Sequence, residues 1–220
     1  MKKFSIFITI FLLFFIVSST QSLADVIPRY TTSIKHTGIG AFNLPNEFNI
    51  YSEPNENSQI ITQIKWNENG LIESDIKENE IFVSFVPSQN IAYCAVDDEI
   101  EGWVKIFYSQ SHGKSGWVKV TSKNRYVSWL GFYMSWGRKN GVYFFKDMPD
   151  INKRLMSAPD ANSQKVWGII YPKFIKLTLV RGNWMMIKLV DFGNEVKLGW
   201  VQWRDENGKF LIFPDMKGEN

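Results

Sequence analysis

Hydrophobic and polar positions alternate in short runs along most of this chain, and a period of two predicts β-strands. The runs are rich in β-branched and aromatic residues, and clusters of Asn, Asp, Gly, Pro and Ser separate them. The first half contains FNIYSE, IITQIKW, GLIESDI, EIFVSFV, IAYCAV, GWVKIFY and SGWVKV, and the second half contains KVWGII, FIKLTLV, NWMMIKLV and LGWVQW. No long window has a sustained helical period, and MPDINKRLM (148–156) is the best candidate for a single helical turn. We therefore expect an all-β protein whose strands are joined by hairpins and closed into small barrels or sandwiches.

One turn-like octet occurs twice, 105 residues apart. SEPNENSQ occupies residues 52–59, and SAPDANSQ occupies residues 157–164. Proline at the third position pre-sets φ for a turn, and the Asn or Asp that follows it can hydrogen-bond the next stretch of backbone. The octets therefore predict the same polar loop after the first strand of two related units.

Each octet is followed by a hairpin with a tryptophan at the start of both strands. A Gly-flanked tryptophan opens the first strand (Trp103, Trp184), and Gly-Trp-Val opens the return strand (Trp117, Trp200). These tryptophans are 14 residues apart in the first copy and 16 in the second, and an even difference keeps each side chain on its own face. The first copy is longer before its hairpin, which predicts an insertion of about 24 residues within 67–101.

Together these pieces resemble the bacterial Src-homology-3-like (SH3b) family. The resemblance is carried by NIYSEPNENSQII with GWVKIFY…SGWVKV, and by RLMSAPDANSQKV with NWMMIKL…LGWVQW. It covers most of residues 45–120 and 142–205 and implies two small, strongly bent antiparallel SH3-like β-barrels in tandem. The family commonly serves as an extracytoplasmic binding module for peptidoglycan or peptides. The chain departs from the family in the insertion, and at Tyr51 and Met156, where a charged residue is usual.

The two expected barrels, at 40–121 and 142–213, are joined by an aromatic connecting segment at 122–141. A flexible linker would be poor in aromatic residues, so we expect a strand or hairpin with Asn140-Gly141 as a turn. An extended chain presents Leu130, Phe132, Met134 and Trp136 on one face, and Trp129, Gly131, Tyr133 and Ser135 on the other. The first face would be core. The second is either a stacking surface for sugar rings or peptides, or a buried face that fixes the barrels together. The ligand-binding candidates on the stacking hypothesis are Trp129, Tyr133, Trp136 and Tyr143.

The first residues have the three-part pattern of a secretory signal. Lys2 and Lys3 precede an apolar run that ends near Val17, and small and polar residues follow as far as Ala24. A spanning helix needs about 20 apolar residues, and this run is shorter. We expect cleavage after Ala24 and export to the periplasm or the exterior. The exported chain would have no membrane association, and would carry an N-terminal segment (25–39) and a C-terminal tail (214–220).

Composition and charge narrow the possible partners. The mature chain would have 196 residues (220 minus 24) and a formal net charge of +1 (+3 minus Lys2 and Lys3), with 45% apolar residues in the whole sequence. A chain this close to neutrality has no global electrostatic reason to bind nucleic acid. Cys94 is the single cysteine, so no internal disulfide can form and stability has to come from packing.

Catalytic and metal-binding patterns are weak. Cys94 could pair with His36 or His112 in a thiol peptidase, but such a nucleophile usually lies at a helix start, and Cys94 lies in a strand-like run. One cysteine and two histidines offer zinc few ligands. The acidic residues Asp97, Asp98, Glu99 and Glu101 lack the glycine-broken spacing of a calcium loop. We expect no enzymatic activity, no cofactor and no metal.

Two classes of function remain. The first is an exported, non-catalytic binding module for cell-wall peptidoglycan or a peptide. The second is a protein partner, such as an inhibitor, immunity or scaffold protein, for another exported protein. A stacking surface at Trp129 and Tyr133 would favour the first class, and a patch of exposed aliphatic side chains would favour the second.

Overall fold

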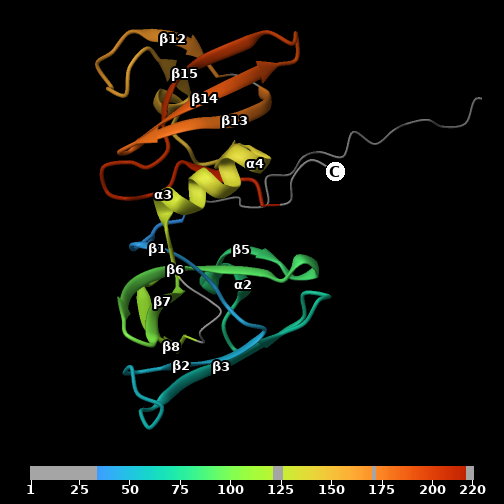
Figure 1. The fold of residues 1–220 in the computed structure, drawn as a ribbon, viewed down its shortest axis with the longest axis vertical. Helices are drawn as coiled ribbons and strands as arrows, with labels where there is room; N and C mark the ends of the chain where they lie inside the picture. Colours follow the sequence, from blue (N-terminus) through green and yellow to red (C-terminus); the bar gives the residue numbers. More distant parts are fainter. Residues whose placement is uncertain (1–33, 121–125, 170–171, 217–220) are drawn as a thin grey trace, which may run out of the picture.

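The computed structural model describes residues 34–120, 126–169 and 172–216, and antiparallel strands dominate it (Figure 1). The predicted signal sequence and part of the N-terminal segment lie outside the described residues. The first half contains β1 (Gly40–Asn43), β2 (Glu47–Tyr51), β3 (Ile60–Trp66), β4 (Ile72–Glu73), α2 (Glu78–Ile81), β5 (Phe82–Val86), η1 (Pro87–Gln89), β6 (Ile91–Ile100), β7 (Trp103–Ser109) and β8 (Lys114–Lys119). The all-β expectation is confirmed at this level.

The rest of the chain begins with β9 (Val127–Ser128) and a helical stretch made of α3 (Trp129–Phe132), η2 (Tyr133–Gly137) and α4 (Arg138–Asn140). It continues with β10 (Val142–Phe144), η3 (Asp150–Asn152), β11 (Arg154–Met156), β12 (Lys165–Gly168), β13 (Pro172–Arg181), β14 (Trp184–Asp191), β15 (Val196–Gln202) and β16 (Ile212–Pro214). The single helical turn expected within 148–156 corresponds to the 3-10 turn η3.

Two separate sheets contain the same order of five strands. The order is β3-β2-β8-β7-β6 in the first sheet and β12-β11-β15-β14-β13 in the second. In both, one residue pair joins the octet hairpin to the tryptophan hairpin, Tyr51 with Trp117 and Met156 with Trp200. We call residues 47–119 the first repeat and residues 154–202 the second repeat. The described strands form open antiparallel sheets and no closed barrel, so the structure supports the all-β class and a repeated sheet order rather than the expected barrels.

The two octets fold into the same loop. Ser52 N donates to Gln59 O and Ser157 N donates to Gln164 O, each at 2.9 Å. Inside the loops, Asn55 Oδ1 accepts from Asn57 N at 2.9 Å, and Asp160 Oδ1 accepts from Asn162 N at 2.8 Å. The last serine of each loop also donates its hydroxyl to two loop carbonyls in the same pattern. Short-range polar contacts therefore fix this turn, which explains why the same letters recur.

The glycine before each return-strand tryptophan has a steric cause. A Cβ on Gly116 would lie 2.5 Å from Ile50 Cγ2, and a Cβ on Gly199 would lie 2.7 Å from Leu155 Cβ. Strand β8 crosses β2, and β15 crosses β11, more closely than a side chain allows. Gly-Trp-Val is therefore a packing signature of the repeat.

The predicted insertion belongs to the first repeat alone. Residues 67–90 separate β3 from β6 and form β4, α2, β5 and η1, whereas only 169–171 separate β12 from β13. Glu80 of α2 holds the insertion against the β7–β8 hairpin. Its Oε2 accepts from Ser109 Oγ at 2.8 Å, and from Ser111 N and Ser111 Oγ at 2.9 and 2.8 Å.

The connecting segment is a helix, and the strand or hairpin prediction for it is wrong. Ser128 caps the helix by accepting a hydrogen bond from Gly131 N at 3.3 Å. At the other end Gly141 has φ of +90° and donates to Gly137 O at 3.1 Å. A glycine at positive φ suits a helix end as well as a hairpin turn, and that ambiguity explains the error at Asn140-Gly141.

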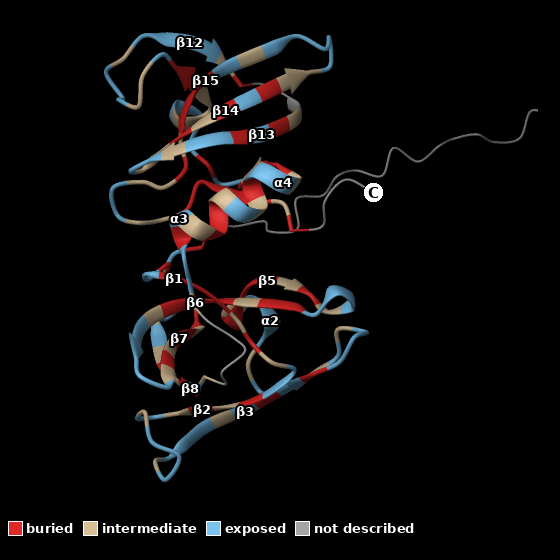
Figure 2. Ribbon diagram, in the orientation of Figure 1, coloured by how far each residue is buried: buried red, intermediate tan, exposed pale blue. Residues whose placement is uncertain are grey.

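The helix lies between the two sheets and belongs to their shared core (Figures 1 and 2). One large cluster of buried side chains combines the helix with both halves of the chain, from Ala41 and Val83 on one side to Ile187 and Phe213 on the other. A second cluster, which includes Cys94, combines the first repeat with Phe42 and Leu44 just before it. Burial of this much apolar surface against one helix joins the two repeats into a continuous structure.

Candidate functional site

Trp129 and Tyr133, the two main candidates from sequence, are interior residues of the shared core. Their side chains are 3% and 0% exposed. Trp129 Nε1 donates to Thr37 O at 2.7 Å on the first side of the helix, and Tyr133 Oη donates to Ile212 O at 2.6 Å on the second. Burial also raises the pKa of Tyr133 well above its ordinary value. In this conformation neither ring has a face open to a ligand, and both serve the alternative role of fixing the two halves together.

Trp136 and Tyr143 are partly buried and pack against the same core. The Trp136 side chain hydrogen-bonds the Tyr93 hydroxyl, and burial raises the pKa of Tyr93. Tyr143 meets Phe145 edge-on, with ring centroids 5.8 Å apart. The structure thus brings all four candidates to one region, as a continuation of the core rather than as a stacking platform.

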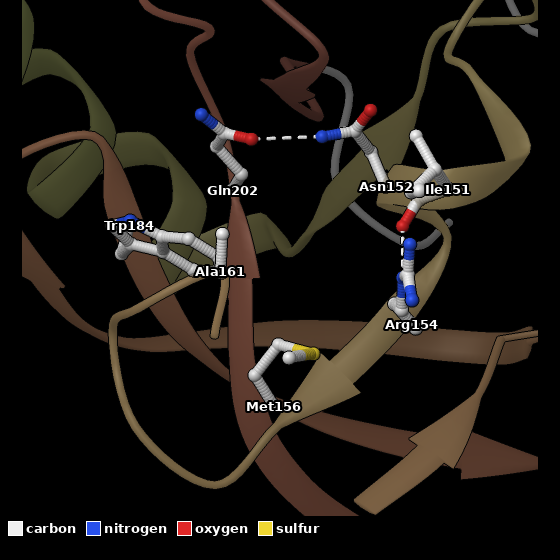
Figure 3. A pocket seen from close by; sticks show the side chains of 7 residues that line it. All are labelled: Ile151, Asn152, Arg154, Met156, Ala161, Trp184 and Gln202. Carbon is white, nitrogen blue, oxygen red and sulfur yellow. Dashed lines mark hydrogen bonds between the residues drawn. The ribbon is translucent and has the colours of Figure 1, made fainter. Parts of the chain in front are cut away.

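The second repeat contains a small pocket that sequence reasoning missed (Figure 3). It has a volume of about 70 Å³ and lies between the octet loop, strand β11 and the tryptophan hairpin. Trp184 and Ala161 lie next to each other at one side, and Met156 lies below them as drawn in Figure 3. The remaining lining residues are Ile151, Asn152, Arg154 and Gln202.

Two carboxamides form the polar rim of this pocket. Asn152 Nδ2 donates to Gln202 Oε1 at 2.8 Å (Figure 3). Arg154 is the one charged lining residue, and its Nε donates to the Ile151 carbonyl. An indole, a thioether and two amides suit a small ligand with both apolar and hydrogen-bonding parts.

At the matched location in the first repeat, side chains of the loop and the hairpin contact one another. Octet and hairpin alignment places Tyr51 at Met156, Glu56 at Ala161, and Lys119 at Gln202. Tyr51 packs edge-on against Trp103 with centroids 5.5 Å apart, and Lys119 Nζ lies 2.6 Å from Glu56 Oε2. The pocket of the second repeat therefore corresponds to a location in the first repeat that an aromatic pair and an ion pair span. The three exchanges are visible once the repeats are aligned, but only the fold shows that they meet.

A wider depression in the first repeat lies between β3 and the insertion, with a volume of about 410 Å³. Its aromatic member, Trp66, is 4% exposed and donates its indole N–H to Pro45 O at 3.0 Å. Polar side chains form most of the remainder, namely Asn46, Asn67, Glu68, Ser88, Gln89 and Asn90, together with Pro87. Because the ring of Trp66, its aromatic lining residue, is buried in the core, this depression is a weaker candidate for a binding site than the pocket of the second repeat.

Cys94 has the environment of a packed thiol. It is 0% exposed, and its Sγ donates to Phe42 O at 3.4 Å. Burial raises the pKa of the thiol, which disfavours the reactive thiolate. The two histidines contact other residues. His36 packs on Phe107 with ring centroids 5.5 Å apart, and His112 Nδ1 lies 2.7 Å from Ser111 Oγ. This geometry gives no support to a Cys–His catalytic pair.

The acidic residues of β6 interact with neighbouring side chains and backbone. Asp97 accepts from Ser115 Oγ at 2.9 Å and lies 3.5 Å from Lys105 Nζ, and Asp98 accepts from the backbone N–H of Glu99 at 2.8 Å. Within the described ranges no cluster of three or more His, Cys, Asp or Glu side chains is arranged to hold a metal ion. None of the helices in residues 34–120, 126–169 and 172–216 has the length and apolar character required to cross a bilayer.

Comparison of the chain with models of known protein families gave no match, and neither did comparison with curated proteins.

Proposed function

We propose that this protein is an exported, non-catalytic binding module whose second repeat holds a group of cell-wall peptidoglycan or of a peptide. The observation that carries the proposal is the pocket between the octet loop and Trp184, which combines an indole wall with paired amides. Export rests on the predicted signal sequence. The non-catalytic assignment rests on the weak catalytic patterns and on the buried, hydrogen-bonded Cys94.

The fold part of the proposal is that both repeats are divergent SH3-like units. Three features support it: the shared five-strand order, the matching octet loops, and the glycine that each Gly-Trp-Val motif needs for close strand crossing. In this view the insertion at 67–90 and the connecting helix are additions to a duplicated small β unit.

Sacculus binding tests this function directly. The mature chain is mixed with purified sacculi, and the fraction that pellets is measured for the unchanged protein, for Trp184→Ala and for Trp103→Ala as the matched control. Losing one aromatic contact worth about 1.4 kcal/mol would weaken binding about tenfold, so Trp184→Ala should pellet poorly while Trp103→Ala pellets normally. Equal pelleting of both variants would move the binding site away from this pocket, and absence of any pelleting would contradict a cell-wall ligand.

A second candidate function, partner of another exported protein, is favoured by exposed apolar side chains on the second repeat. Phe192 at the β14–β15 hairpin tip is 74% exposed, and Val196 and Leu198 of β15 are 59% and 55% exposed. Trp167 is 47% exposed, and Lys197 Nζ lies 3.5 Å from the centre of its ring. Aromatic side chains such as Phe192 and Trp167 are enriched at protein interfaces.

The two candidates respond to different changes. A whole-periplasm pulldown is repeated with Phe192→Ser and with Trp184→Ala. Loss of one captured protein with Phe192→Ser alone would favour the partner function, whereas a captured set that is insensitive to Phe192→Ser would count against it.

A further inference from the structure

The closed site of the first repeat shows how this location can be occupied. Tyr51 lies against Trp103, and its hydroxyl accepts from Asn49 Nδ2 at 3.3 Å. Glu56 reaches from the octet loop to Lys119 on the return strand at 2.6 Å. The chain itself thus supplies one aromatic group and one hydrogen-bonded bridge between the loop and the hairpin.

In the second repeat each of these groups is shortened or neutralised. Met156 replaces the tyrosine, Ala161 replaces the glutamate, and Gln202 replaces the lysine. The exchange of Glu56 and Lys119 for Ala161 and Gln202 removes one negative and one positive charge together. The pocket of about 70 Å³ lies where the first repeat has this ion-pair bridge.

The amide pair on the rim fixes the hydrogen-bonding character of this volume. Asn152 and Gln202 share one hydrogen bond of 2.8 Å, which leaves a donor on one carboxamide and an acceptor on the other. The same remains true if both carboxamides are flipped, because each carries one oxygen and one NH₂. A secondary amide, with one N–H and one C=O, is the simplest complement to such a pair.

Charge and size agree with this assignment. No acidic side chain lines the pocket, and Arg154 directs its Nε to the Ile151 carbonyl. A volume of about 70 Å³ corresponds to about five to seven water-sized positions, at 10–15 Å³ each. An amide with a methyl group on one side fills that space, and the methyl group would lie against Trp184 and Met156.

Given the proposed binding function, we infer that the second repeat alone is the receptive copy and that its pocket takes an uncharged secondary amide, either the acetamido group of an amino sugar or a peptide unit. The first repeat is the same site closed by its own Tyr51 and its Glu56–Lys119 pair.

The test introduces the side chains of the first repeat at the matched positions of the second. Backbone amide signals of ¹⁵N-labelled mature protein are followed by NMR during titration with N-methylacetamide, with acetate as the charged control. Two further arms separate the sources of the amide: N-acetylglucosamine against glucose, and N-acetylalanine methylamide against alanine. The closed variant combines Ala161→Glu with Gln202→Lys, and a fuller version adds Met156→Tyr.

The expected result is that N-methylacetamide shifts signals around residues 151–161, 184 and 202 and leaves those around 49–56, 103 and 119 unchanged. The closed variant should bind at least tenfold more weakly while its spectrum remains that of a folded protein. Tighter binding of acetate, equal shifts in both repeats, or unchanged affinity in the folded closed variant would each overturn the inference.

Sacculus pelleting keeps this result separate from the proposed function. If sacculi bind the closed variant as well as the unchanged protein, the inference fails and the function stands. If the amide probe fills the pocket but neither sacculi nor a peptide is retained, the inference stands and the proposed function fails.

Discussion

The two repeats have one strand order and one loop but differ where the loop meets the tryptophan hairpin. In the first repeat Tyr51, Glu56 and Lys119 close that location, and in the second repeat Met156, Ala161 and Gln202 leave it open. The backbone scaffold therefore does not decide whether the site exists. Side chains at three matched positions decide it, so duplication of a structural unit has produced one filled and one available version.

The largest expected effect concerns the helix that joins the two repeats. Trp129→Ala removes a buried indole and its hydrogen bond to Thr37, and such a deletion typically costs about 3–5 kcal/mol. Calorimetry should show one unfolding transition in the unchanged protein and a much lower Tm in the variant. Leu130→Ala is the control, because Leu130 is 55% exposed in the same helix and should change stability by less than about 0.5 kcal/mol. Two independent transitions, with only one shifted, would show that the repeats are not held as one unit.

The next prediction tests whether the close strand crossing is equivalent in the two repeats. Gly116→Ala and Gly199→Ala each place a Cβ within 2.7 Å of a neighbouring side chain, and overpacking of this kind costs about 1–3 kcal/mol. Both variants should therefore be less stable than the unchanged protein by similar amounts, as measured by denaturant titration. Gly168→Ala is the control, because its Cβ would meet nothing closer than 3.9 Å. A clear loss in only one of the two variants would argue against equivalent strand crossings.

A smaller, pH-dependent effect belongs to the insertion of the first repeat. Burial raises the pKa of Glu80, but hydrogen bonds from Ser111 and Ser109 and the electrostatic effect of His112 outweigh it, so that this pKa lies below its ordinary value. A carboxyl whose folded pKa is lowered stabilises the protein above its unfolded pKa and loses that contribution as pH falls through the folded pKa.

Thermal melts at a series of pH values check this sign. The unchanged protein should lose stability below about pH 4.5, and Glu80→Gln should be less stable at neutral pH and show a weaker acid loss. Glu73→Gln, at an exposed carboxylate of the same insertion, should retain the full acid dependence. An identical pH profile for Glu80→Gln would remove Glu80 from this role.

The smallest effect concerns the closing ion pair. The Glu56 and Lys119 side chains are 58% and 53% exposed, and exposed pairs of this kind are worth about 0–1 kcal/mol. A double-mutant cycle on Glu56→Ala and Lys119→Gln should therefore give a small coupling that salt weakens. A coupling above about 2 kcal/mol would mean that the pair is a major stabiliser of the first repeat, rather than a pair that only occupies the location of the site.

Much of the local structure was predictable because it depends on local patterns. The alternation in 60–66 predicts a strand, and β3 has those limits. The octets and the tryptophan spacing predict a repeated unit, and the sheet orders agree. Closed barrels were not found in the described strands, because alternation predicts a strand but not whether the sheet it joins closes on itself.

The connecting segment shows where the sequence supported two interpretations. Trp129, Phe132, Tyr133 and Trp136 are spaced as one face of a helix, with an N-cap serine before them and a glycine after them. Taken as a strand, the segment places Trp129 and Tyr133 on one face and Phe132 and Trp136 on the other. Short apolar runs do not separate the two periods. Packing between two sheets resolved this in favour of the helix, and buried the rings that an extended chain would have displayed.

The sequence by itself determined the strands, the octet loops and the duplication, because each depends on contacts between residues close in the chain. The tertiary structure alone decided which residues meet across the octet loop and the tryptophan hairpin. Glu56 and Lys119 are separated by 63 positions, and Ala161 and Gln202 by 41, so their proximity follows from strand order and not from any local pattern. The open site of the second repeat is a consequence of that long-range pairing.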